Sequence, residues 1–395
     1  MFSFLKYYWT LSNWKRCGRK RKRPHIKIGN IPGFFEQLNE TEANYVVLRG
    51  FDRVPATQED ECRMLSDDGD IDILANAEDL LKLCRAVASH PGKIKLDLYS
   101  DRLVLGTDIH RVTYYPPPLC KEILENRIKD ERGGFFRPDD LRYLYSFAYH
   151  LVYHKGLCTG LPSGFPEFST PSGEVDCNGY VKILRDLASA TGQKLPDDLN
   201  LLNLHLWLKQ RGWNMPLDLL LHWPRKHQLL ERLYKYERET LKSDLAGRKN
   251  LCVYLIREDG IKANAVDRIL DELRTHYSIL DIVSFKKEQQ ERVVRRTRGG
   301  NWTKTKHLEL FLPEIAVVCQ ALVPFEPVDD IDFEQGNKVN PDIKFKHEMR
   351  SRLAMDFPEA DDIVHGSDND VESMEYIKAI YGDEWKNRFN RLFKD

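Results

Sequence analysis

Two separate segments of the chain alternate short strand-like runs with helical runs, and a long helical stretch lies between them. The first segment contains NYVVLRGF, GDIDILA and KIKLDLYS, and the second contains NLCVYLIRED, SILDIVSF and EIAVVCQALV. Strands and helices that alternate in this way bury a core of their own. With 395 residues, the chain has room for two or three domains of about 100–200 residues each. The pattern therefore predicts a multidomain α+β protein.

Changes in this pattern suggest four parts. We expect an amino-terminal arm over residues 1–30, a small α/β domain over 31–118, a helical section over 119–247 and a second α/β or α+β domain over 248–395. In the helical section, apolar residues recur at helical spacing in RPDDLRYLYSFAYHLVYHKG. Between the first two strands of the small domain, the charged run from Asp52 to Gly69 is interpreted as a loop.

Composition excludes several classes of protein. The formal net charge is −1 and 31% of residues are charged, which argues against bulk disorder and against a stable nucleic-acid partner. The eight cysteines form no CxxC pair, so neither a zinc site nor a disulfide framework is indicated, and a reducing cytoplasm fits best. The sequence contains no run of about 18 apolar residues, so we expect no membrane-spanning helix.

The amino-terminal arm combines aromatic residues with a basic cluster that extends to Arg23. Aromatic rings settle at the depth of lipid headgroups while Lys and Arg meet the phosphates, so residues 2–23 predict contact with an anionic membrane surface. This interpretation implies a cytoplasmic protein peripheral to the inner membrane. A disordered basic arm, aromatic residues packed on the protein itself, and a nucleic-acid-binding arm are the alternatives.

Three aspartates of the small domain are candidate metal ligands. Asp70 and Asp72 lie two apart on a predicted strand and therefore project from the same face, and Asp97 lies on the next strand-like run. Converging carboxylates repel one another unless a cation joins them, and Mg²⁺ bridging to phosphates is the usual solution. The alternative is a set of solvated carboxylates at strand ends.

The segment from about Asn44 to Ser100 resembles the nucleotidyltransferase superfamily that includes polymerase beta and small antibiotic-modifying enzymes. The resemblance rests on a Gly-containing turn after a strand, then Asp-x-Asp, then a third acid. It implies that the three aspartates are catalytic and bind Mg²⁺, and that Arg49 and Gly50 contact the nucleotide. The superfamily has Gly-Ser in the first turn, where this chain has Gly50 and Phe51.

A histidine pair, His150 and His154, is spaced i, i+4 in YHLVYHKG and is followed by Lys155. The spacing places both imidazoles on one helix face. They either cap the helix or pack in the core, or they line an anionic substrate pocket together with Lys155.

The carboxy-terminal segment, from about Lys249 to Lys386, resembles nucleoside diphosphate kinase. In order, REDG after a strand, NPDIKFKHEMRSRL and DDIVHGSDNDVES follow the motifs of that family. The resemblance implies a ferredoxin-like domain in which His365 accepts a phosphoryl group. It also implies that Ser367 is a hydroxyl partner of the phosphoryl group. The implied cationic partners are Arg257, Arg350 and Arg352.

Several residues depart from that family. Arg257 stands in place of the first-turn lysine, Asp362 in place of an asparagine and Val339 in place of a threonine. An added residue in HGSDNDVES leaves Glu372 or Glu375 as the glutamate that orients the histidine. We therefore expect poor general nucleoside diphosphate kinase activity. The alternative is that His365 caps a helix or makes structural hydrogen bonds.

The run VRRTRGGNW places Arg295, Arg296 and Arg298 beside a Gly-Gly turn. Guanidinium groups beside a turn with free N–H groups suit a phosphate or carboxylate, so Arg296 and Arg298 are predicted to bind an anion. A solvated basic loop is the alternative.

Together these features predict a metal-dependent transferase that moves a nucleotidyl or phosphoryl group of a nucleotide or sugar phosphate. The pairing of the two domains with a basic arm looks like proteins of bacterial surface-polysaccharide assembly, which is an analogy at the level of fold. A non-catalytic nucleotide-binding scaffold and a toxin-like nucleotidyltransferase are alternatives. An oligomer is possible.

Overall fold

The computed structural model describes residues 25–67, 69–102, 112–168, 179–224, 227–297, 312–326, 341–360 and 363–393, together with residues 10, 12, 13 and 16 of the arm. It divides the chain into two compact units. Unit 1 comprises Met1–Met215, Leu219–Glu231 and Trp302–Lys306, and unit 2 comprises Pro216–Asp218, Arg232–Asn301 and His307–Asp395. Both contain helices and sheets, which agrees with the expected α+β class. Among the helices within the described ranges, none is both long and apolar enough to cross a membrane.

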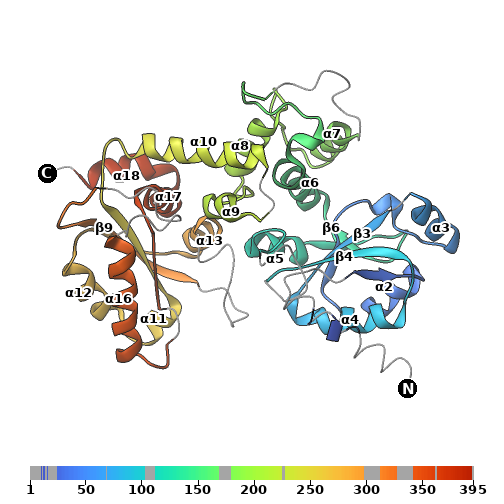
Figure 1. The fold of residues 1–395 in the computed structure, drawn as a ribbon, viewed down its shortest axis with the longest axis horizontal. Coiled ribbons are helices and arrows are strands. Elements are labelled where there is room, and N and C mark those ends of the chain that lie inside the picture. Colours follow the sequence, from blue (N-terminus) through green and yellow to red (C-terminus); the bar gives the residue numbers. More distant parts are fainter. Residues whose placement is uncertain are drawn as a thin grey trace. The chain divides into compact units, whose positions relative to one another are not determined.

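Unit 1 is built on a mixed four-stranded sheet (Figure 1). Its strand order is β1-β4-β3-β2, with β3 and β4 parallel and the two outer pairs antiparallel. The strands are β1 (Ile26–Ile28), β2 (Tyr45–Val47), β3 (Asp70–Ala75) and β4 (Ile94–Ser100).

The two faces of this sheet differ in chemistry. Two helices, α2 (Ile31–Glu40) and α4 (Leu80–Ser89), pack against one face through an apolar core that includes Ile71 and Leu96 (Figure 1). Because side chains alternate across a strand, the residues between these apolar positions project from the opposite face. Asp70, Asp72 and Asp97 therefore lie on the face that α2 and α4 do not cover.

The segment expected to be a loop between Asp52 and Gly69 contains a helix, α3 (Gln58–Ser66), so that prediction is wrong. Thr57 caps the helix by accepting a hydrogen bond from the Asp60 backbone N–H, and three acidic residues occupy its first turn. Acidic residues at this position stabilise a helix through its dipole. The charge that suggested a loop is therefore part of a helix start.

The rest of unit 1 is mainly helical. A short antiparallel pair, β5 (Arg127–Lys129) and β6 (Phe136–Pro138), precedes α6 (Asp140–Tyr149), which continues as a single π-helical segment, η3 (His150–Lys155). The other described elements are η1 (Phe51–Arg53), η2 (Ala77–Asp79), α5 (Pro117–Glu125), η4 (Gly156–Thr159), α7 (Tyr180–Ala190) and α8 (Leu201–Gln210). Two further helices, α9 (Leu217–His222) and α10 (Gln228–Asp244), contribute to both units.

Unit 2 contains a second four-stranded sheet, entirely antiparallel, with strand order β10-β7-β9-β8. Its strands are β7 (Leu251–Arg257), β8 (Tyr277–Ser284), β9 (Pro313–Ala321) and β10 (Val364–Gly366). One face packs against α12 (Val266–Arg274) and α16 (Pro341–Asp356), and α13 (Lys287–Arg296) and α17 (Asp370–Tyr381) lie on the other side (Figure 1). The remaining elements are α11 (Glu258–Lys262), η5 (Gly382–Glu384) and α18 (Trp385–Arg391).

Candidate functional site

Three carboxylates meet on the polar face of the first sheet. Asp72 lies directly opposite Asp97 in the parallel register of β3 and β4, and Asp70 lies two residues before Asp72 on the same face. One carboxylate oxygen from each residue lies within 4.8 Å of the other two. The sequence had placed these side chains on neighbouring strands, and the structure brings them together.

Two cations compensate the cluster. Lys95 lies opposite Asp70 in the register, and its Nζ is 3.0 Å from Asp70 Oδ2 and 3.1 Å from Asp97 Oδ2. Arg49 comes from the turn after β2, and its Nη2 is 2.8 Å from Asp72 Oδ2. Lys95 is half exposed, whereas the Arg49–Asp72 pair is largely buried.

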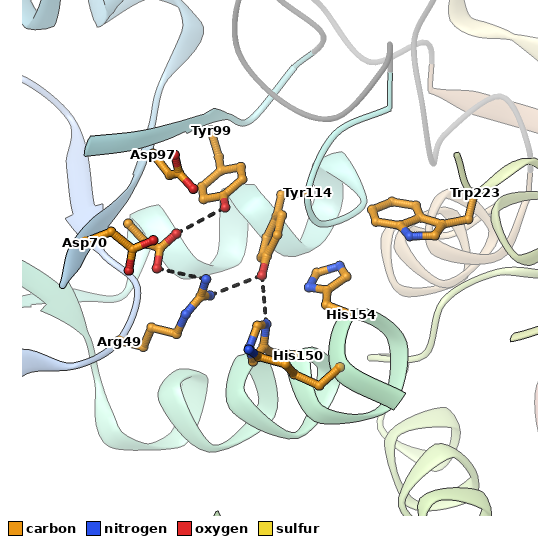
Figure 2. Close-up of a pocket in the computed structure, with 10 residues that line it drawn as sticks. Arg49, Asp70, Asp97, Tyr99, Tyr114, His150, His154 and Trp223 are labelled. Carbon is orange, nitrogen blue, oxygen red and sulfur yellow. Dashed lines mark hydrogen bonds and ion pairs between the residues drawn. The ribbon is translucent and has the colours of Figure 1, made fainter. Parts of the chain in front are cut away.

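A chain of hydrogen bonds leads from Asp72 into the helical part of unit 1. Tyr99 donates its hydroxyl proton to Asp72 Oδ1 over 3.1 Å, and Arg49 Nη1 donates to the Tyr114 hydroxyl over 3.2 Å. That hydroxyl lies 2.7 Å from His150 Nδ1. The carboxylate, the guanidinium and the imidazole are thus held as one polar network (Figure 2).

Burial shifts the ionisation of this network. Desolvation raises the pKa of Asp72, and the nearby Arg49 opposes the rise. Burial also lowers the pKa of His150 well below its usual value, with Arg49 adding to the effect, so this imidazole stays neutral at pH 7. Although burial alone would lower the pKa of Arg49, Tyr114 and Asp72 raise it well above its usual value.

A cavity of about 280 Å³ opens beside the carboxylates (Figure 2). It brings Arg49 and Lys155, both predicted to bind substrate, to the same space as the three aspartates. The remaining lining residues are polar or aromatic, and they are Tyr99, Tyr114, His150, His154 and Trp223. One wall of the cavity therefore carries the carboxylates together with Arg49, while η3 supplies Lys155 and two imidazoles.

Local backbone geometry explains how two of these cations are positioned. Gly50 adopts φ +68°, a left-handed conformation that turns the chain directly after Arg49. Gly156 adopts φ +55° directly after Lys155, and a Cβ there would lie 2.5 Å from His227 Cε1. The π-helical segment η3 carries His150, His154 and Lys155, and such segments are frequent at functional sites.

In unit 2, His365 lies on β10 beside α17. Its Nε2 is 2.9 Å from the hydroxyl of Tyr376, which donates to Glu372 Oε1 over 2.9 Å. Glu372, one of the two glutamates suggested to orient the histidine, therefore reaches it through a tyrosine rather than directly. Glu372 Oε2 also accepts from the Asp368 backbone N–H.

Other predicted partners of His365 make structural contacts. Buried Ser367 accepts a hydrogen bond from the Val253 N–H through its Oγ and joins Ser373, so its hydroxyl links β7 to the start of α17. Arg350 Nε donates to the Val364 carbonyl, and Arg352 forms an ion pair with Glu272 over 2.7 Å.

The remaining predicted residues are dispersed. Arg257 is buried at the start of α11, and Arg296 ends α13, where burial lowers the pKa of its guanidinium. Arg298, Val339, Asp362 and nearly all of the arm lie outside the described residues. The predicted anion site at residues 294–302 is therefore described only up to Thr297.

Sequence reasoning missed four contributors to the site in unit 1, which are Lys95, Tyr99, Tyr114 and Trp223. Lys95 precedes Asp97 by two residues in KIKLD, so strand alternation alone would have placed the two on one face. Tyr114 and Trp223 are far from the aspartates in sequence, and no motif marks them. Only the folded chain brings those rings to the cavity.

The chain has no match among protein-family models, curated proteins or solved structures.

Proposed function

We propose that unit 1 binds a phosphate-bearing ligand together with a divalent cation, and transfers a nucleotidyl or phosphoryl group of a nucleotide or sugar phosphate. The observation that carries the proposal is the convergence of Asp70, Asp72 and Asp97 on a cavity that Arg49 and Lys155 also line. A purely structural cluster of carboxylates has no need of such a cavity.

The charges of the cavity wall favour a metal-bound anion. The three carboxylates oppose the binding of a phosphate beside them, and the nearby cations Arg49 and Lys95 are already paired with those carboxylates. A divalent cation reverses that balance and provides coordination positions for phosphate oxygens. Carboxylate oxygens are hard ligands of the kind that Mg²⁺ accepts, and Mg²⁺ usually shares its coordination between protein carboxylates and substrate phosphates.

Each residue then has a distinct task. Asp70, Asp72 and Asp97 would hold the cation, which when bound polarises a phosphoryl oxygen. Arg49 orients Asp72 and opposes the rise in its pKa that burial causes, and Lys155 offers an ammonium to the phosphates. His150, neutral and bonded to Tyr114, keeps that tyrosine and Arg49 in place.

The arrangement of strands supports this assignment. Asp-x-Asp on β3 beside a third acid on the parallel strand β4 is the arrangement implied by the nucleotidyltransferase resemblance. Gly50 and Phe51 occupy the positions at which that superfamily carries Gly-Ser, so the serine hydroxyl is absent. The residue before them, Arg49, brings a guanidinium to the cavity instead.

Binding of ATP with and without Mg²⁺, measured by calorimetry on the full chain, tests the proposal. We expect Mg²⁺-dependent binding that Asp97→Asn weakens by at least about 100-fold, because the substitution removes a ligand charge. Asp101→Asn is the matched control, since Asp101 follows β4 but binds the Ala77 N–H instead of lining the cavity. Binding that is independent of Mg²⁺, or equal in both variants, would contradict the proposal.

Catalysis is separable from binding. Incubation with ATP labelled at the α-phosphate or at the γ-phosphate would show which group moves, and Asp97→Asn should abolish that transfer. Tight binding without transfer of either label would favour the non-catalytic scaffold instead.

For unit 2 the proposal is a nucleoside diphosphate kinase-type, ferredoxin-like domain with poor phosphoryl-carrier activity. Its support is the strand order β10-β7-β9-β8 and the chain from His365 through Tyr376 to Glu372. Incubation with γ-labelled ATP should give little acid-labile label. Abundant label that His365→Ala abolishes would show that His365 is a working carrier.

The association of the arm with a membrane is also a proposal. Residues 2–23 would attach the chain to the inner face of an anionic membrane, consistent with a role in surface-polysaccharide assembly. Its support is the run of aromatic and then basic residues. Sedimentation with anionic vesicles should fall when residues 1–23 are deleted, and equal sedimentation would rule the attachment out.

A further inference from the structure

Lys95 occupies the place in the acidic cluster where a cation is needed. Its ammonium lies 3.0 Å from Asp70 Oδ2 and 3.1 Å from Asp97 Oδ2, so it links two of the three carboxylates. These contacts follow from the parallel register, which sets Lys95 opposite Asp70 and two residues before Asp97. The side chain is 53% exposed and is therefore able to move into solvent.

From this contact we infer that Lys95 makes the site selective for a metal–phosphate complex over a free divalent cation. The inference rests on the proposed function of unit 1 and assigns a further ligand-binding residue to it. A free cation must displace the ammonium from both carboxylates, and the ammonium gains no new anionic partner in return. Lys95 therefore opposes the binding of metal alone.

A phosphate ligand changes this balance. Phosphate oxygens that arrive with the cation give the displaced ammonium an acceptor at the same edge of the sheet, and lysine binds phosphate well as a point charge. The carboxylates then hold the metal while Lys95 and Lys155 contact the anion. The same side chain thus weakens the binding of bare metal and strengthens the binding of the complex.

The chain offers a closely matched control for Lys95. Lys27 lies directly opposite Lys95 in the antiparallel register of β1 and β4, so both project from one face of the sheet. Lys27 is exposed, and within the described part of the chain it forms no ion pair with the three carboxylates. Lys27→Met removes a charge from the same surface without touching the cluster.

The test is a titration of the full-length protein with Mn²⁺ alone and with Mn²⁺ plus ATP, followed by the electron paramagnetic resonance signal of free Mn²⁺. We expect Lys95→Met to bind Mn²⁺ alone about tenfold more tightly than the wild type, equivalent to about 1.4 kcal/mol. The same variant should bind the Mn²⁺–ATP complex more weakly than the wild type. Lys95→Arg keeps the charge and should bind Mn²⁺ alone about as tightly as the wild type. The control Lys27→Met should match the wild type in both titrations.

The outcomes separate this inference from the function on which it rests. Wild-type binding of Mn²⁺–ATP that is lost in Asp97→Asn, with the two affinities unchanged in Lys95→Met, would refute the role of Lys95 alone. Tighter binding of both the metal and the complex by Lys95→Met would also refute it, because Lys95 would then be only a competing charge. If the wild type binds neither, the proposed function fails and this inference fails with it.

Discussion

The cavity of unit 1 and the surroundings of His365 in unit 2 both gather polar side chains near a strand, but they use them differently. Around Asp72, side chains from β3, β4, the turn after β2 and η3 converge on a common space. Around His365, Ser367 accepts a hydrogen bond from the Val253 N–H, and Arg350 donates one to the Val364 carbonyl. The motif in unit 2 is more specific in sequence, but the described contacts of Ser367 and Arg350 hold the backbone, whereas those of unit 1 surround a cavity.

A buried carboxylate in each unit, Asp72 in unit 1 and Asp342 in unit 2, shows a similar difference in surroundings. Asp72 is paired with Arg49 at the cavity wall, whereas Asp342 accepts a hydrogen bond from Tyr277 over 2.7 Å inside the core of unit 2. Desolvation raises the pKa of both groups. Asp72 and its partner Arg49 line a cavity that a ligand can enter, whereas Asp342 lies in the core near Tyr277 and Lys346, where burial of its charge mainly costs stability.

The largest effect is expected from breaking the buried pair in unit 1. Arg49→Ala should destabilise unit 1 by about 3 kcal/mol, because Asp72 is left as a buried charge without its counterion. Urea unfolding with amide exchange of the β3 peptides would measure this. Arg53→Ala, a nearby exposed arginine, is the control and should change stability little. If Arg49→Ala and Arg53→Ala were equally stable, the Arg49–Asp72 pair would not be needed for the stability of unit 1, and this prediction would be wrong.

A smaller effect, dependent on pH, is expected in unit 2. Burial raises the pKa of Asp342 from 3.8 to about 6, so folding favours its protonated form. The ionised carboxylate therefore opposes folding above about pH 6, and this penalty disappears below about pH 4. Asp342→Asn should be more stable than the wild type by about 2 kcal/mol at pH 7.5. Thermal unfolding at both pH values should show the difference vanish at pH 4, and a difference independent of pH would contradict this account.

The next effect concerns the serine of the sequence motif. Ser367→Ala should destabilise unit 2 by about 1–2 kcal/mol, because the buried Val253 N–H loses its acceptor. The exposed Ser351 on α16 provides the control substitution Ser351→Ala. Denaturant unfolding compares the two variants. A stability loss confined to Ser351→Ala would mean that Ser367 has no structural role.

The sequence predicted those parts of the site that depend on local pattern. Strand alternation placed Asp70 and Asp72 on one face, and the next strand supplied Asp97. The expected loop around Asp60 was wrong because a cap and an acidic first turn make a helix from charged residues. Arg49 was expected to contact nucleotide, but its pairing with Asp72 through a turn at Gly50 was not foreseen.

The rest depended on contacts between distant segments. Tyr114 packs on Tyr99 of β4 and on His154 of η3, and Trp223 packs on His154, so both rings reach the cavity through contacts between segments distant in sequence. In unit 2, the sequence motif identified His365. The Tyr376 hydroxyl that links His365 to Glu372 could not be predicted, because its position depends on how α17 packs.

The most direct test of the central claim is a crystal structure of the full chain soaked with Mn²⁺ and ATP, with anomalous scattering used to locate the metal. The account predicts an anomalous peak bounded by Asp70, Asp72 and Asp97, with phosphate density extending toward Lys155. A peak and nucleotide density beside His365, with none at the three aspartates, would contradict it.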